Sequence, residues 1–173
     1  MKKVLKYSGI ISLILAAIAF ILMMASPAVV YKSGSTTIEF GGTMAIFGGP
    51  TDLNQKGILL ITGDAKLSIM ALLAWILILV GMIIILLGVI LPLLKVTALE
   101  KFAGVLNLIA VICLILGGVF MFLVVPTFFS ANDRSVPDGT SITFGWVFGG
   151  ILAIAGGVFA ILPAAMDFIG KKK

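Results

Sequence analysis

Four long segments of this chain contain no charged residue, and this pattern restricts the fold more than any other feature. The uncharged segments hold 25, 28, 31 and 28 residues and lie at positions 7–31, 67–94, 102–132 and 139–166. A helix of about 20 apolar residues crosses the hydrocarbon core of a bilayer, so each segment can hold one crossing. The sequence therefore predicts an all-α integral membrane protein, a bundle of four transmembrane helices. The expected spans lie at about 8–30, 67–91, 102–125 and 146–169.

Composition favours burial in lipid over a water-soluble core. Hydrophobic residues make up 61% of the 173 residues and charged residues 11%, whereas a soluble domain carries about 25% charged residues. The net charge of +5 is not gathered into a patch that would bind nucleic acid, because the charges lie at the ends of the apolar segments. A length of 173 residues leaves room for one membrane domain, residues 1–173.

The first apolar segment also partly matches a cleaved signal peptide, with Lys2 and Lys3 before it and Ser26-Pro27-Ala28 after it. Its apolar stretch is longer than the 7–15 residues of a signal core. We therefore expect it to be retained as a span.

Positive charges are divided unequally between the two sides of the predicted bundle. Eight lysines lie on the side that holds both termini, and four Lys or Arg residues lie on the other side. An excess of Lys and Arg marks the cytoplasmic side, so both termini are predicted to be cytoplasmic, in a plasma membrane of the bacterial type. Tyr7, Tyr31 and Trp146 are expected to be interfacial anchors near span ends, and the deeper Trp75 is expected to pack between helices.

The two predicted outer segments, about 31–66 and 126–145, contain short strand patterns. Residues 35–40 alternate polar and apolar side chains and are rich in β-branched residues, which is typical of a strand. Further strands are predicted at 43–47, between glycine pairs, and at 58–62. A small extracellular β-element built from both outer segments is therefore expected.

The second outer segment repeats part of the first. The sequence TTIEFG at Thr36–Gly41 is echoed by TSITFG at Thr140–Gly145, and each stretch is followed by Phe-Gly-Gly. The echo raises the hypothesis that residues 1–91 and 95–173 are duplicated halves. A chance match in a chain rich in Gly and Phe is the alternative.

Paired in one sheet, the two echoed stretches would share an apolar face. Side chains two residues apart point to the same side of a strand. The residues expected on this face are Ile38, Phe40, Ile142 and Phe144. An isolated pair of strands is only marginally stable in water, so we expect three or four strands that rest on the helix ends.

Four spans, a long first outer segment with strands and a shorter second one with a strand resemble the claudin-type tetraspan architecture. The claudin signature has a Trp, a Gly-Leu-Trp and two Cys in the first outer loop, and none of these lies between Tyr31 and Lys66. The chain is also similar to small, poorly characterised four-span proteins of bacterial membranes. The resemblance implies an architecture, and a fold alone does not carry a function.

Small residues line one face of the fourth predicted span. Gly145, Gly149, Ala153 and Gly157 follow one another at four-residue spacing. Membrane helices approach closely at such positions, so this face is predicted to pack within the bundle or, alternatively, to form an oligomer interface. Asn107 is the one strongly polar side chain within the spans, and it is expected to hydrogen-bond a neighbouring helix.

Catalytic chemistry is scarce in this sequence. It contains no histidine, which excludes Ser-His-acid and Cys-His triads and the HExxH zinc motif. The single cysteine, Cys113, lies in the middle of an apolar segment, where a small buried hydrophobe is the better interpretation. We therefore predict that the chain is not an enzyme, and that it has no catalytic residue, cofactor or metal.

What remains is a binding or structural role. We expect a non-enzymatic membrane scaffold or accessory subunit that contacts the lipid bilayer and either a second copy of itself or another membrane protein. Its contacts would use the small-residue face of span four and the outer-segment residues Phe40, Phe47, Ile142 and Phe144. The alternative function is an oligomeric pore for small solutes or lipid.

Overall fold

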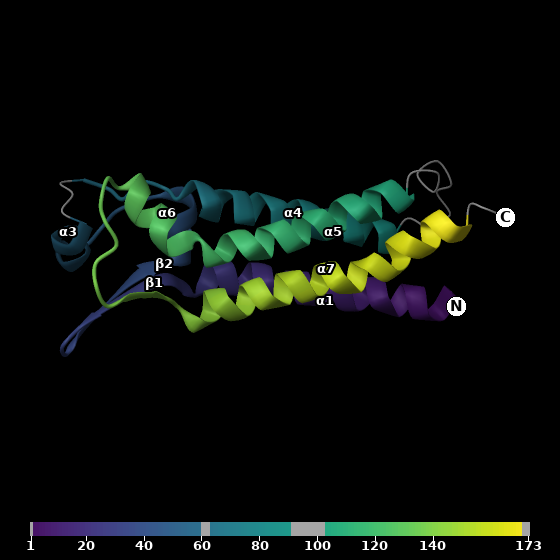
Figure 1. The fold of residues 1–173 in the computed structure, drawn as a ribbon, viewed down its shortest axis with the longest axis horizontal. Helices are drawn as coiled ribbons and strands as arrows, with labels where there is room; N and C mark the ends of the chain where they lie inside the picture. The colour runs from purple at the N-terminus through teal and green to yellow at the C-terminus, as the bar shows by residue number, and fades with distance from the viewer. Residues whose placement is uncertain (1, 60–62, 91–102, 171–173) are drawn as a thin grey trace.

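Four long helices lie side by side in an elongated bundle, and both chain ends lie at the end of the bundle farther from the strands (Figure 1). The computed structural model describes residues 2–59, 63–90 and 103–170. Each long helix contains a stretch that is long and apolar enough to cross a membrane, which confirms the four predicted spans at this level. The long helices are α1 (Lys2–Ala25), α4 (Ile69–Ile90), α5 (Ala103–Phe122) and α7 (Phe144–Gly170).

The opposite end of the bundle carries a compact unit that we call the head. Its strands are β1 (Pro27–Ser33), β2 (Thr36–Gly41) and β3 (Thr140–Ile142). Its short helices are α2 (Gly42–Phe47), α3 (Leu53–Leu59) and α6 (Val124–Ala131). The head therefore combines residues from both predicted outer segments.

Two spans end earlier than predicted, and a proline follows each end. Helix α1 ends at Ala25 because Pro27 disfavours a helical Ser26 and begins β1 instead. Helix α5 ends at Phe122 because Pro126 has no N–H to donate to the Phe122 carbonyl, and α6 begins after the break at Leu123. The last residues of the first and third predicted spans thus belong to the head.

The sheet has the order β2-β1-β3, and both neighbours of β1 are antiparallel to it. The β1–β2 hairpin turns at Gly34-Ser35, where Gly34 has a φ of 57°. A glycine at the first of two central residues suits the type II′ turn, whose twist matches that of the strands. This turn signal could have been read from the sequence, and it would have revealed β1.

The echoed stretches both enter the sheet, on opposite sides of β1. Val29 of β1 pairs with Phe40 on one side and with Ile142 on the other, and Ile38 lies on the same face as Phe40. Phe144 was wrongly placed on this face, since it begins α7. After α1 the chain enters a strand, whereas after α5 it enters a helix, and the duplication of the two halves stays a hypothesis.

Two predicted strands are wrong. Residues 43–47 lie in α2, and Ile58 and Leu59 lie in α3, while 60–62 fall outside the described residues. Helix α3 has a capping box in which Asp52 Oδ1 accepts the Gln55 N–H at 2.7 Å and Gln55 Oε1 accepts the Asp52 N–H at 3.1 Å. Short apolar runs do not distinguish a strand from a buried helix, whereas the capping residues Asp52 and Gln55 indicate the start of a helix.

One face of the sheet is covered by α6. The Phe40 ring lies 5.3 Å from the Phe128 ring and 5.9 Å from the Phe129 ring, and all three side chains are buried. The opposite face carries exposed Lys32, Thr37, Glu39 and Ser141 around the buried Val30. The sheet thus has one apolar face toward α6 and one polar face.

Glycines permit the closest approach of helices in the bundle. A Cβ added to Gly118 of α5 would lie only 2.6 Å from the carbonyl oxygen of Gly150 in α7. Helix α1 is joined to α7 by hydrogen bonds from buried serines: Ser8 Oγ donates to the Phe159 carbonyl at 2.5 Å, and Ser12 Oγ to the Gly156 carbonyl at 2.6 Å. A carbonyl has two lone pairs, so these bonds need not break the helical ladder of α7.

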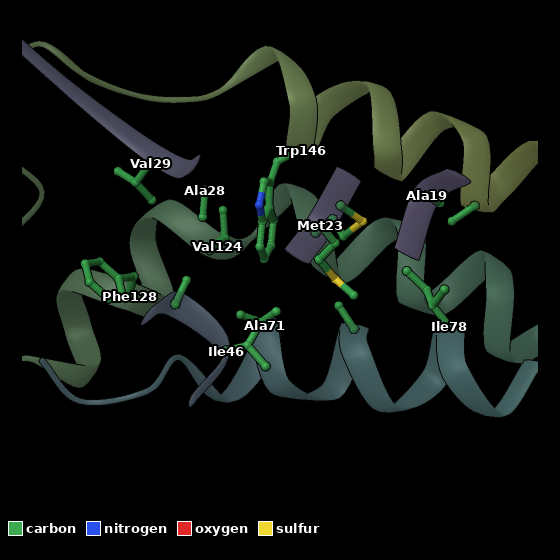
Figure 2. Packing of buried hydrophobic residues seen from close by; sticks show 14 of the residues in the cluster. Ala19, Met23, Ala28, Val29, Ile46, Ala71, Ile78, Val124, Phe128 and Trp146 are labelled. Atoms are coloured by element: carbon green, nitrogen blue, oxygen red, sulfur yellow. The ribbon is translucent and has the colours of Figure 1, made fainter. Parts of the chain in front are cut away.

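Trp146 lies in the core where the bundle meets the head, near Met23, Val124 and Ile46 (Figure 2). The prediction that Trp146 is an interfacial anchor is wrong, because its side chain is fully buried. Its Nε1 has no hydrogen-bond partner among the residues that the structure describes. Trp75 packs as expected between helices, with the Phe20 ring of α1 at 6.1 Å.

The Gly118→Ala substitution should destabilise the bundle. The new methyl group meets backbone atoms, so α5 and α7 must separate, at a cost of about 1–3 kcal/mol. The measurement is the unfolding midpoint of purified protein in one detergent. Gly57→Ala is the matched control, since nothing lies within 4 Å of its added Cβ; an equal loss at both positions would contradict the packing argument.

Candidate functional site

The small-residue face of α7 is occupied by other segments of the same chain. A Cβ on Gly145 would lie 2.3 Å from Ser26 Oγ, and one on Gly157 would lie 2.7 Å from Ile115 Cγ1 of α5. Gly149 faces Met121 and the backbone of α1, and Ala153 is buried. These four residues pack within the bundle. A partner that binds α7 must therefore contact the opposite face of this helix.

The outward faces of all four long helices are apolar. Large exposed apolar side chains recur along each of these helices, many of them at three- or four-residue spacing, as expected for a stripe on one face of a helix. In α1 this stripe consists of Ile11, Ile14, Ile18 and Ile21, and in α4 it includes Ile76, Val80, Ile83 and Leu87. The surface of the bundle therefore offers apolar contact on every side.

Asn107 lies beside α4 near the end of the bundle that is farther from the head. Its Oδ1 would lie 3.3 Å from a Cβ on Gly88, so the absence of a side chain at that position leaves room for the amide. The structure places Asn107 at the α4–α5 interface, and its hydrogen bond to a neighbouring helix stays a prediction.

The predicted outer contact residues do not form one surface. Phe40 is fully buried beneath α6, so its assignment as a contact residue is wrong, and Ile142 is half-buried. Phe47 and Phe144 are exposed, at 49% and 80% of their surface. The Phe144 ring stacks on Phe148 at 5.6 Å with an interplanar angle of 9°. The exposed members thus lie where the head joins the bundle.

A group of polar contacts, which we call the latch, fixes α6 to the segment before α4. Asn132 is only 2% exposed. Its Nδ2 donates to the carbonyls of Phe128 at 2.8 Å and of Lys66 at 3.3 Å, and its Oδ1 accepts the Lys66 N–H at 2.9 Å. The hydroxyls of Ser68 and Thr127 lie 2.6 Å apart. The latch was not predicted, because no local pattern in the sequence pairs Asn132 with Lys66.

An exposed ion pair lies beside the latch. Lys66 Nζ is 2.7 Å from Asp133 Oδ2, and the two side chains are 64% and 80% exposed. Asp133 has a φ of 56°, because it adopts the left-handed conformation that ends α6. Its N–H donates to the Ser130 carbonyl, and the Arg134 N–H donates to the Phe129 carbonyl. The hydrogen bond and positive charge of Lys66 lower the pKa of Asp133.

Helix α3 is held at the outer tip of the head. Gln55 Nε2 donates to the Glu39 carbonyl on the edge of β2 at 2.7 Å, and Arg134 Nε donates to the Leu59 carbonyl at 2.7 Å. The Gln55 side chain thus occupies the Glu39 carbonyl, which the edge strand β2 would otherwise offer to a strand of another chain. Leu53, at the start of α3, is 87% exposed.

Among the described residues, no group of three or more His, Cys, Asp or Glu side chains could hold a metal ion. The features that remain are surfaces: the apolar stripes of the bundle, the exposed phenylalanines and the head. No known protein family matches this chain, and no curated protein matches it either.

The Asn132→Asp substitution should weaken the latch. A carboxylate cannot donate to the carbonyls of Phe128 and Lys66, and its charge would be buried, so we expect a loss of about 2 kcal/mol or more in unfolding free energy. Chemical denaturation in detergent measures this loss. The exposed Asn54→Asp is the control, and we expect a change within about 0.5 kcal/mol. Equal stability of the two variants would refute the latch.

The Lys66–Asp133 pair should contribute to stability only above acidic pH. The pKa of Asp133 is lower in the folded protein than in the unfolded chain, so its contribution is present above the unfolded value of about 3.9 and disappears as pH falls through the folded value. Asp133→Asn should therefore unfold at a slightly lower temperature than the parent at pH 7. The difference should shrink as pH falls below the unfolded value, and it should also shrink in high salt; a difference that grows in acid would contradict this sign.

Proposed function

We propose that this chain is a non-enzymatic integral membrane scaffold or accessory subunit. The observation that carries the proposal is the apolar outward surface of all four long helices, combined with a close-packed interior. No Asp, Glu, Lys or Arg occurs in α4 or α5. Carriers and proton relays usually place ionisable side chains or broken helices inside the membrane, so a passive role fits this bundle better.

The head supplies the specific part of the proposed role. The Phe40–Phe128–Phe129 cluster joins the sheet to α6, hydrogen bonds of Gln55 and Arg134 hold α3, and the latch fixes α6. A surface that is rigid before binding loses less conformational freedom when a partner binds. The head would present the polar sheet face and the exposed Leu53 to a partner outside the membrane.

The proposed location is a plasma membrane of the bacterial type, with both termini in the cytoplasm. Support comes from the excess of lysine on the side of the termini, which lie at the end of the bundle opposite to the head. Lys95, Lys101 and Lys171–Lys173, which contribute to that excess, lie outside the described residues. In this orientation the head is extracellular.

We also propose that the architecture is of the claudin type. A sheet that joins strands of both outer segments, placed on four apolar helices, supports this assignment. The sequence departs from the claudin signature in the first outer segment, and its one cysteine, Cys113, leaves no partner for a disulfide within the chain. The head would therefore depend on the latch and the aromatic cluster for its stability.

An oligomeric pore is the alternative function. The helices of one copy approach closely at Gly118, Gly150 and Gly157, so the four helices of one chain would not enclose a wide channel. A conducting path would have to lie between copies, through their apolar outward faces.

Cross-linking at native expression level, followed by affinity capture and mass spectrometry, tests the scaffold proposal. We expect capture of one or more unrelated membrane proteins, and we expect loss of that capture when residues of the head surface such as Leu53 are changed to Asp. Purified protein in liposomes should give no solute flux above that of empty vesicles. Solute flux from the purified chain, together with a ring of copies in native mass measurements, would contradict the scaffold proposal and support the pore.

A further inference from the structure

Helix α2 lies at the level of the bundle, although it belongs to the first outer segment. It crosses from α1 to α4: the Gly42 N–H donates to the Ser26 carbonyl at 3.1 Å, and the Ser68 N–H donates to the Ala45 carbonyl at 2.8 Å. A Cβ on Gly42 would lie 2.1 Å from the carbonyl oxygen of Met23 in α1, so the two helices touch through their backbones.

The side chain at the end of α2 extends farther along the bundle. The Phe47 ring contacts Trp75 of α4 edge to face at 5.2 Å, and Trp75 in turn packs against Phe20 of α1. Trp75 lies six residues inside the start of α4, which corresponds to about 9 Å along the helix. Phe47 therefore lies alongside the long helices.

Helices α1 and α4 leave space for this insertion. Of the four pairs of neighbouring long helices, α1 and α4 have the least extensive contact. Ala45 and Ile46 of α2 are buried in the head–bundle junction, whereas Phe47 keeps half of its surface exposed. Figure 2 shows Ile46 next to Ala71 of α4. Helix α2 thus acts as a wedge between the two long helices at their outer ends.

The sequence around this wedge is also unlike the rest of the first outer segment. The 12 residues between Glu39 and Asp52 carry no charge, although charges recur on both sides of them. An uncharged stretch with a half-exposed Phe is poorly suited to water, whereas aromatic side chains are favoured at the boundary between lipid and water.

From these observations we infer that α2 is immersed in the outer leaflet, with Phe47 in contact with lipid acyl chains. This inference rests on the proposed insertion of the bundle in a bilayer, and it adds a contact from an outer segment to those of the long helices. The surface that meets lipid then continues from the stripe of α4 across Trp75 to Phe47. The head therefore contacts the outer leaflet through α2.

Spin labels at three single-cysteine positions test the inference. Cys113→Ala removes the native thiol, and nitroxides are attached to Phe47→Cys, Leu53→Cys and Ile83→Cys in the full chain, reconstituted in phosphatidylcholine–phosphatidylglycerol vesicles. Collision with oxygen, which concentrates in lipid, is compared with collision with a water-soluble nickel chelate. Leu53 is the matched control in the same outer segment, and Ile83 reports the exposed stripe of α4.

We expect the oxygen-to-nickel ratio at position 47 to resemble that at position 83 and to exceed that at position 53 severalfold. A ratio at position 47 equal to that at position 53, with a high ratio at 83, would overturn the wedge and leave the membrane insertion intact. A low ratio at all three positions would overturn the insertion itself, and with it the proposed function.

A second measurement keeps Phe47 in place, in case the cysteine variant does not fold. Brominated phospholipids quench tryptophan on contact; Trp146 is fully buried, so quenching reports on Trp75 beneath Phe47. Bromines near the headgroup end of the acyl chain should quench more than bromines near its terminus, and Trp75→Phe should remove this difference. Equal quenching at the two depths would contradict the inference.

Discussion

The contact between Gly118 and Gly150 fixes how closely α5 and α7 pack, and the rest of the bundle depends on it. Side chains at these positions would hold the two backbones apart. In the membrane proposed for this bundle, the hydrophobic effect would not drive the helices together, so association would depend on close packing and on polar contacts. The serine bonds from α1 to α7 and the glycine positions of α4 and α5 follow the same rule. Small residues thus set the spacing of this bundle, and Leu114 and Ile78 fill the spaces at Gly81 and Gly117.

The head is stabilised in a different way. Its apolar centre, the cluster of Phe40, Phe128 and Phe129, resembles the core of a small soluble domain, and it is supplemented by hydrogen bonds from Asn132 and Gln55. The bonds between Asn132 and Lys66 reach the connection before α4, and the Gln55 bond reaches the Glu39 carbonyl on the edge of β2. They satisfy backbone groups that would otherwise be left without a partner. Loss of the Asn132 or Gln55 side chain would therefore remove a contact within the head and also leave a backbone group without its partner.

The sequence predicted the coarse fold and missed the connections. Long uncharged segments predicted the four helices and β-branched alternation predicted β2, because these signals are local, whereas β3 was predicted from its echo of β2. The strand β1 was hidden inside the first apolar segment, where Pro27 and the Gly34-Ser35 turn were the available clues. The burial of Trp146 and Phe40 could not be predicted, because it depends on α2 and α6, whose positions are set by distant contacts. The same is true of the latch, which joins residues 66 and 132.

The order of strands has a consequence for how the protein is made. The central strand β1 follows α1 at the start of the chain, whereas β3 directly precedes the last helix. A growing polypeptide can form the β1–β2 hairpin soon after α1 has been made, yet the other edge of β1 stays open until β3 has been translated. An unpaired strand edge is a template for association with other chains. The nascent protein is therefore open to misassembly at this edge from the synthesis of β1 to the synthesis of β3, and truncation before Thr140 would make that state permanent.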